Sequence, residues 1–222
     1  MKVTHIYHSG CLVELENHVL LFDYYKGDLN INEDKPLYVF VSHSHYDHFN
    51  KDIFQLNHPN VTYILSSSIQ YNYHAYYLEN NQDYQINDLT IHTLLSTDEG
   101  CAFIVEVENK VIYHAGDLNW WHWEGEPDED NNYQRITYQQ QINLIKQSID
   151  IAFVVVDSRQ EKDYLLGLQY FLNHTKTKYI FPIHYFGNYS ISSQLKKENL
   201  INPNHTIIKY ITHKNEDFII ED

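Results

Sequence analysis

Four side chains that can bind a metal fall within the six residues His43-Ser44-His45-Tyr46-Asp47-His48. Three imidazoles and one carboxylate are a donor set typical of borderline-soft divalent metals. His43 and His45 project to the same side of an extended segment, and Asp47 and His48 follow where the chain turns, so the two pairs approach from different directions. The chain contains 15 His, which makes a chance cluster the alternative. The spacing nevertheless predicts a metal site.

Side chains of the same kind follow three other apolar runs. These are Asp23 after Val19–Phe22, Asp117 after Val111–His114 and a small Ala-Gly pair, and His184 after Tyr179–Ile183. Functional side chains of sheet proteins gather where strands end and loops begin. We therefore expect Asp23, Asp117 and His184 to belong to the same site.

The elements that must position these residues are mostly short strands. The strands expected from apolar, β-forming runs between turn residues are Val3–Tyr7, Cys11–Glu16, Val19–Asp23, Leu37–Val41, Val61–Leu65, Leu89–Leu95, Cys101–Val107, Lys110–His114, Ile151–Val156, Tyr179–Ile183, Ile207–Ile211 and Phe218–Ile220. The segment Asn72–Leu78 is too rich in aromatic residues to assign.

Three segments predict helices. One face is marked by Tyr138, Ile142, Ile145 and Ile149 at helical spacing, and a second by Leu165, Leu168 and Leu172. Ser192–Asn199 predicts a short third helix. Strand-rich segments interrupted by helices in both halves indicate two packed sheets with helices outside, in one domain over residues 1–222.

Composition narrows the class of protein. A net charge of −15 argues against a broad electrostatic grip on nucleic acid. Cys11 and Cys101 lack a CxxC spacing and are expected to be small buried hydrophobes. No apolar run is long enough for a membrane span, and the first residues lack the apolar core of a signal peptide. A cytoplasmic protein without membrane partners is expected, and homo-oligomerisation is left open.

The HxHxDH loop, the later Gly116-Asp117 and the late His184, in this order, resemble the metallo-β-lactamase fold superfamily. The contexts of Asp117 and His184 look most like the metal-dependent hydrolase group near the ascorbate-6-phosphate lactonase-like members. The resemblance extends from residue 3 to about residue 186. It implies a mixed α and β fold, a four-layer αββα sandwich of two mixed sheets with helices on the outer faces, and a site at one edge of the sheets.

Carried over residue by residue, the resemblance implies two metals. His43 and His45 would hold the first, Asp47, His48 and His184 would hold the second, and Asp117 would bridge them. Asp23 would orient the ligands from behind. One or two divalent ions are implied, with zinc the first expectation and manganese or iron as alternatives.

The chain departs from the family between the motif and Asp117. The family supplies a third His to the first metal from a loop there, but Leu94–Gly100 contains none. His92 lies within a predicted strand, so Asp98 is the better candidate ligand, and a solvated turn residue is the alternative reading of Asp98. A single metal held by the second set would still be chemically competent.

Such a site predicts metal-assisted hydrolysis. A metal-bound hydroxide would be the nucleophile, because a metal with an open position lowers the pKa of its water to about 7. Asp47 is the expected catalytic residue, which orients the hydroxide or accepts its proton.

The segment after Asp117 contains Trp120, Trp121, His122 and Trp123. Indole rings either pack on the core or line a pocket, and the nearby metal site favours a pocket. Trp120, Trp121, His122 and Tyr185 are therefore candidate substrate contacts, with an exposed loop residue as the alternative for His122. Two further His are expected to support the ligands, namely His8 and His114. Asp157 and Arg159 are more simply read as an ion pair or loop residues.

Three functions follow from these patterns. The favoured one is a metal-dependent hydrolase of a small anionic ester, lactone or phosphodiester. The second is a phosphodiesterase or nuclease of the ribonuclease Z kind, against which the net charge counts. The third is a non-catalytic metal-binding domain, for which the missing third His is the argument.

Overall fold

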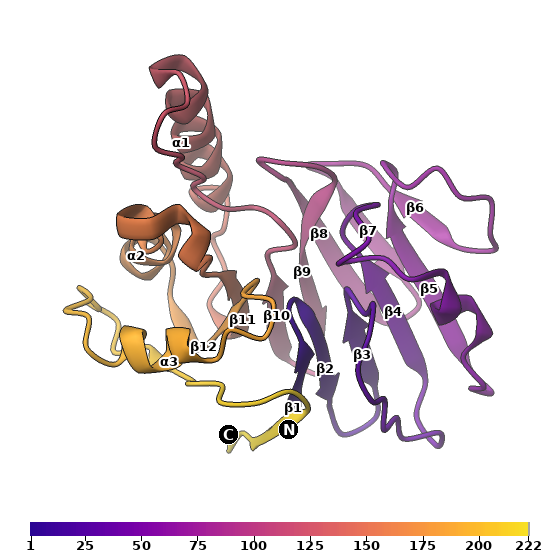
Figure 1. The fold of residues 1–222 in the computed structure, drawn as a ribbon. Helices are drawn as coiled ribbons and strands as arrows, with labels where there is room; N and C mark the ends of the chain where they lie inside the picture. Colours follow the sequence, from indigo (N-terminus) through magenta and orange to yellow (C-terminus); the bar gives the residue numbers. More distant parts are fainter. Residues whose placement is uncertain (222) are drawn as a thin grey trace.

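Two seven-stranded sheets face each other in the computed structural model, which describes residues 1–221 (Figure 1). The strands of the first sheet, in spatial order, are β14 (Glu216–Ile219), β1 (Lys2–Tyr7), β2 (Gly10–Glu14), β3 (Val19–Phe22), β4 (Leu37–Val41), β5 (Val61–Ser66) and β6 (Tyr76–Leu78). Those of the second are β13 (Ile207–Ile208), β12 (Thr177–Ile183), β11 (Ile149–Val155), β10 (Lys110–His114), β9 (Cys101–Val107), β8 (Leu89–Leu95) and β7 (Asp83–Ile86).

Each sheet is mixed. In the first, β14 through β3 pair antiparallel, and β3 through β6 pair parallel. In the second, β7 through β10 pair antiparallel, and β10 through β13 pair parallel. The parallel strands are nearly continuous apolar runs because both of their faces are covered. The predicted two-sheet sandwich is confirmed.

Aromatic rings fill the space between the sheets. Phe22 stacks on Phe40 at 4.8 Å, and Phe40 meets Phe103 of the second sheet at 5.3 Å between ring centroids. His114 of β10 stacks on Phe22, so its neighbour Tyr113 points to the outer face of the second sheet. There Tyr113 packs on Phe171.

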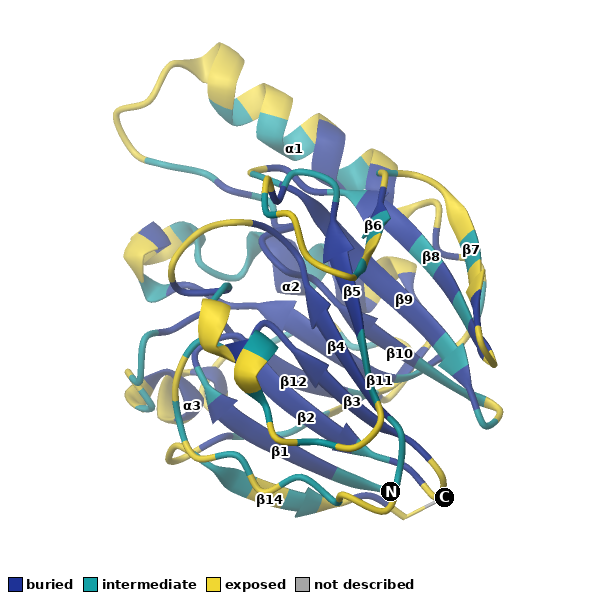
Figure 2. Ribbon diagram, turned by 90° about the vertical axis from the view of Figure 1, so that its right-hand side faces the viewer, coloured by how far each residue is buried: buried dark blue, intermediate teal, exposed yellow. Residues whose placement is uncertain are grey.

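The outer layers differ between the two sheets. Helices α1 (Asp128–Ile142) and α2 (Leu166–His174) cover the second sheet. The N-terminal part of α1 is largely exposed (Figure 2). The outer face of the first sheet is covered by loops and a 3₁₀ helix, η1 (Lys51–Gln55), whose Ile53 is buried in the same hydrophobic cluster as Val39 and Leu65. Helices were expected on both outer faces, and on this face the helix is the short η1.

Several element boundaries also differ. The helix expected through Ile145 and Ile149 ends at Ile142, and Ile149 begins β11. The strand expected over Ile207–Ile211 is limited to Ile207–Ile208. Four elements were not predicted, namely β6, which lies in the unassigned segment Asn72–Leu78, β7, η1 and the 3₁₀ helix η2 (Ser158–Asp163). The short helix α3 spans Ser190–Leu195. Among residues 1–221, no helix is both long and apolar enough to cross a membrane.

Candidate metal centre

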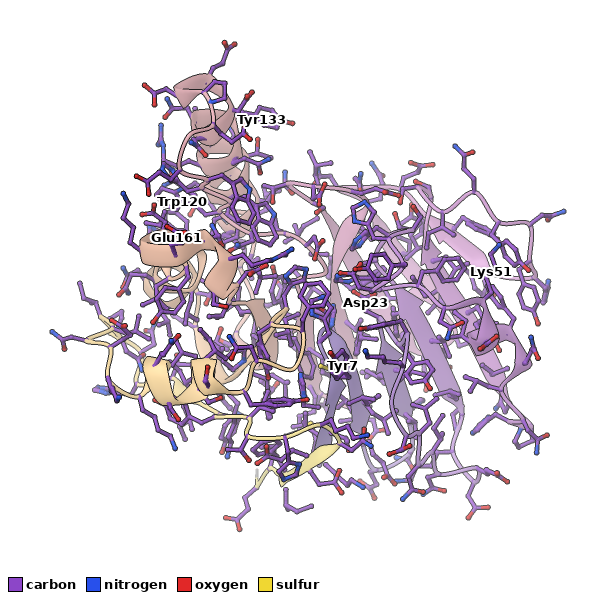
Figure 3. All side chains as sticks on the ribbon, viewed as in Figure 1. Tyr7, Asp23, Lys51, Trp120, Tyr133 and Glu161 are labelled. Carbon is purple, nitrogen blue, oxygen red and sulfur yellow. The ribbon has the colours of Figure 1, made fainter. Side chains whose placement is uncertain are left out.

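The candidate site lies where parallel strands of both sheets end. β1, β3 and β4 run in one direction in the first sheet, as do β10, β11 and β12 in the second. The residues that follow these strands are His8, Asp23, the His43–His48 loop, Asp117, Asp157 and His184. Asp23 lies among these strand ends, between the sheets (Figure 3).

Three imidazoles surround the carboxylate of Asp117. The Nε2 atoms of His43, His48 and His184 lie 3.3, 3.1 and 3.2 Å from its oxygens. All four side chains are buried, with Asp117 exposed by only 4%. This is the group that the sequence predicted from HxHxDH, Gly-Asp and the late His, and the structure brings it together.

The second ring nitrogen, Nδ1, of each of these three histidines has its own hydrogen-bond partner. His48 Nδ1 donates to Asp23 at 2.8 Å, and His184 Nδ1 donates to Asp157 at 3.0 Å. The Ser42 hydroxyl donates to Asp23 and therefore accepts from His43 Nδ1. With Nδ1 protonated, each neutral ring turns an Nε2 lone pair toward the site.

This arrangement fits a divalent ion. Nε2 lone pairs that face carboxylate oxygens repel each other unless a proton or a metal ion lies between them, and the Nε2 atoms of His43 and His48 and Oδ1 of Asp117 have no hydrogen-bond partner despite being buried. Ligands about 2.0–2.1 Å from a tetrahedral ion are about 3.3 Å apart, close to the separations found around Asp117. The donor set and its spacing therefore match a metal centre.

Asp47 and His8 form a second pair beside this group. The Nε2 atom of His8 is 3.2 Å from Asp47 Oδ2, and His8 Nδ1 accepts the backbone N–H of Phe186 at 3.1 Å. Because Nδ1 accepts, the proton of neutral His8 must be on Nε2, the ring nitrogen that lies 3.2 Å from Asp47. Donor atoms of His8, Asp47, His48 and His184 lie within 4.8 Å of one another, but in this tautomer neither nitrogen of His8 offers a free lone pair to a metal.

The first-metal side of the site is more exposed. Donor atoms of His45, Asp98 and Asp117 lie within 4.8 Å of one another, which keeps Asp98 as a candidate ligand. The His45 side chain is 44% exposed, and its Nε2 is 3.5 Å from Glu99, a residue that the sequence analysis did not single out. Glu99 also accepts the Ser44 hydroxyl at 2.8 Å.

Buried charge sets the protonation states of the metal-free site. Burial alone would lower the pKa of His48 and His184, but the Asp117 carboxylate outweighs burial and raises both. Burial alone would raise the pKa of Asp117, but the same imidazoles hold it well below its usual range.

The pKa values of two neighbouring carboxylates, Asp47 and Asp157, are also lowered. Against burial, His8 lowers the pKa of Asp47 to about 2. His184 and Arg159 together lower that of Asp157 to about 2, again against burial. The carboxylates are therefore ionised at neutral pH, the state that binds metal.

His114 has a structural role. It donates from Nε2 to the Ser9 carbonyl at 2.9 Å and accepts the Gly116 N–H at Nδ1, so neither nitrogen is available to a metal. It links the second sheet to the turn after β1. The expected support of the ligands by His114 is thus indirect, through the backbone next to Asp117.

A cavity of about 490 Å³ opens beside the site. Five of the candidate metal residues line it, and the other lining residues are Tyr46, Trp121, Trp123, Gln134, Arg159 and Phe186. Of the four predicted substrate contacts, Trp121 belongs to this lining, and its indole donates to the Asp117 carbonyl at 3.0 Å.

The other three predicted contacts lie elsewhere. Trp120 packs toward Tyr170, and His122 lies 3.8 Å from Asp163. Tyr185 is buried against His5. Successive side chains of an extended segment point to opposite sides. Trp121 and Trp123 therefore face the pocket, whereas Trp120 and His122 face away from it.

Sequence reasoning missed the contributions of Asp157, Gln134 and Phe186. Asp157 forms the ion pair with Arg159 that the sequence indicated, but its carboxylate also orients the His184 ring. Its place after an apolar strand was the same signal that identified Asp117. Gln134 reaches the pocket from α1, and no local pattern marks it.

Residues 2–123 match the family model described as the beta-lactamase superfamily domain. The match covers more than half of the chain, so the chain belongs to this superfamily, as its motifs predicted. No curated protein matches the chain in sequence. The finer resemblance to ascorbate-6-phosphate lactonase-like members stays a prediction.

Solved structures share the fold at low sequence identity. Igni18, a metallo hydrolase from Ignicoccus hospitalis, has 14% identity and a TM-score of 0.66, with 100% of each chain covered. The metallo-beta-lactamase fold protein YhfI from Bacillus subtilis has 15% identity and a TM-score of 0.64, with 98% of each chain covered. CmlA, a diiron beta-hydroxylase from Streptomyces venezuelae, has 8% identity and a TM-score of 0.54, over 82% of this chain and 44% of that one.

Proposed function

We propose that this protein is a metal-dependent hydrolase of a small anionic ester, lactone or phosphodiester. The observation that carries the proposal is the buried Asp117 carboxylate facing three imidazole Nε2 atoms at 3.1–3.3 Å beside an open pocket. The superfamily and the hydrolase name of Igni18 support the same reaction class.

The ligands would be His43, His45, Asp98 and Asp117 for a first ion, and Asp47, His48, Asp117 and His184 for a second. An ion bound there would lower the pKa of its water to about 7 and so provide hydroxide at neutral pH. The protein's own contribution is to hold the imidazoles in one tautomer through Ser42, Asp23 and Asp157.

Asp47 is the proposed catalytic carboxylate. His8 lies beside one of its oxygens, Oδ2, so the other remains to orient the nucleophile or accept its proton. Trp121 restricts access of water to the ligand His184, whose ring lies 5.5 Å away between centroids. A water-poor site strengthens the electrostatic interactions within it.

Zinc is the proposed metal, with manganese or iron as alternatives. Mixed imidazole and carboxylate donors accept all three, and Asp98 would make the first position richer in oxygen than a three-His site. The name of CmlA as a diiron protein supports keeping iron among the candidates.

The pocket supports a small-molecule substrate. Its volume of about 490 Å³ is within the range typical of small-molecule sites. The net charge of −15 disfavours the nuclease alternative.

The test measures metal per chain and hydrolysis of a panel of lactones, esters and phosphodiesters. Asp117→Ala is compared with the parent protein and with Asp34→Ala, which removes an exposed carboxylate. We expect Asp117→Ala to lose metal and activity together, and Asp34→Ala to keep both. A parent protein that binds metal but hydrolyses nothing in the panel would overturn the hydrolase proposal in favour of a metal-binding domain. Cleavage of phosphodiesters alone would favour the nuclease-like alternative.

A further inference from the structure

Arg159 is the only Lys or Arg that lines the pocket among the residues that the structure describes. It follows β11 in the 3₁₀ helix η2 and lines the cavity together with Asp98 and Tyr46. Its side chain is 55% exposed, so a ligand in the cavity can reach it.

The guanidinium is fixed on two sides. Nε and Nη2 both donate to the carboxylate of Asp157, and the carbon between the nitrogens lies 5.1 Å from the ring centre of Phe186. Phe186 itself stacks on His8 at 3.9 Å, which holds the ring in place. Within residues 1–221 no acceptor is found for Nη1. A planar cation that is held on one edge and keeps donors on the other is suited to an anionic ligand.

The charge of the loaded site points to the same kind of ligand. Three carboxylates line the pocket, those of Asp47, Asp98 and Asp117, and two divalent ions would outweigh them by one positive charge. Asp157 occupies Nε and Nη2 of Arg159, so the N–H groups of Nη1 stay available to a ligand. A locally positive pocket in a protein of net charge −15 would select an anion at close range.

An apolar surface lies in the same cavity. Trp121 and Trp123 stack with their rings 7° from parallel and 5.7 Å apart, and both line the pocket. Indole faces bind flat apolar groups well. The pocket therefore combines one fixed cation with a flat aromatic wall.

We propose that Arg159 binds the anionic group of the substrate and that Trp121 and Trp123 contact its flat apolar body. The ligand class is a small organic carboxylate or phosphate that carries a ring or a similar planar group. Calling this ligand a substrate rests on the proposed function, but its binding can be measured without turnover.

The experiment titrates the zinc-loaded protein with benzoate, phenyl phosphate and the neutral benzamide, followed by tryptophan fluorescence. The parent protein should bind at least one anion more tightly than benzamide, and the stronger of the two identifies carboxylate or phosphate as the recognised group. In Arg159→Gln this preference should fall about tenfold, whereas benzamide binding should not change. Arg159→Lys should keep part of the preference, and Arg135→Gln, which changes the chain's other arginine on α1, should keep all of it.

Metal content and thermal unfolding of each variant separate binding from a purely structural role. The inference is overturned if anions and benzamide bind the parent equally, if the preference survives in Arg159→Gln, or if it disappears only in proportion to lost zinc. The last result would mean that Arg159 acts by positioning Asp157 and His184. The hydrolysis panel decides the proposed function independently, since a protein that binds anions through Arg159 but cleaves nothing would retain this inference and lose that one.

Discussion

Gly100 tests how closely the His43–His48 loop must pack against the second sheet. Its φ of +72° is in the left-handed region, and a Cβ added there would lie 1.9 Å from the Ser42 carbonyl oxygen and 2.8 Å from the Cβ of His43. The contacted atoms belong to the Ser42 backbone and to the proposed ligand His43, so neither can move without shifting the site. Gly100→Ala should therefore damage both stability and metal binding.

The expected size follows from two costs. A left-handed alanine costs about 1–2 kcal/mol, and forcing a packed core apart costs about 1–3 kcal/mol. We take about 3 kcal/mol for Gly100→Ala, which for a domain of this size lowers the Tm by about 6–12 °C. Gly125 is the matched control, because its φ is also positive at +91° but an added Cβ would meet nothing within 4 Å. Gly125→Ala should lose only the conformational part, about 1 kcal/mol.

Urea and thermal unfolding of both variants measure the difference, and chelator competition measures metal affinity. The difference between the two substitutions isolates the steric part, since both glycines have positive φ. If Gly100→Ala is no less stable than Gly125→Ala, the close approach of Gly100 to Ser42 has no energetic weight, and the reasoning is refuted.

Asp23→Asn replaces a carboxylate that accepts from Ser42 and from His48 Nδ1, so we expect metal affinity to fall about 10- to 100-fold in chelator competition; an unchanged affinity would contradict its orienting role. Burial lowers the pKa of His5 to about 4, so as the pH falls below 6.5 the unfolded chain binds this proton first and the folded state loses stability. Urea unfolding of the metal-free protein should show a free energy of unfolding that falls between pH 6.5 and pH 4. His5→Gln should reduce the slope of this fall by up to about 1.4 kcal/mol per pH unit, whereas substitution of an exposed histidine, His213→Gln, should not change the slope. Adding zinc at about a thousandfold excess over its Kd should stabilise the metal-free protein by about 4 kcal/mol, a Tm increase of about 8–16 °C, and the absence of a shift would argue against the site.

The sequence predicted much of the site because its ligands are local or end strands. The HxHxDH spacing is readable without tertiary information, and Asp117 and His184 each follow an apolar run. Parallel strands place such residues at one edge automatically. The same logic predicted most strands within one or two residues, since their apolar runs are bounded by turn residues.

Other features depend on tertiary contacts that no local pattern encodes. The donor to His8 is the backbone N–H of Phe186, 178 residues away, on a segment with a φ of +47°. Side-chain spacing alone does not predict that α1 ends at Ile142, because Ile145 and Ile149 continue the helical repeat. In the structure the chain turns after Ile142, and Ile149 begins β11. Local periodicity describes which residues are buried, not which element buries them.

The site also has a consequence for how the two sheets hold together. Apolar rings such as Phe40 and Phe103 join them in the core, but at this edge the contacts between them include polar ones, as in Asp117 with His48 and His114 with the Ser9 carbonyl. A bound ion would coordinate His43 and His48 from the first sheet and Asp117 and His184 from the second. Metal binding would therefore cross-link the sheets where their apolar contact ends. The strand ends around Asp117 should consequently be the part of the sandwich whose local opening depends most on the metal, whereas the Phe22–Phe40–Phe103 core should open only with global unfolding.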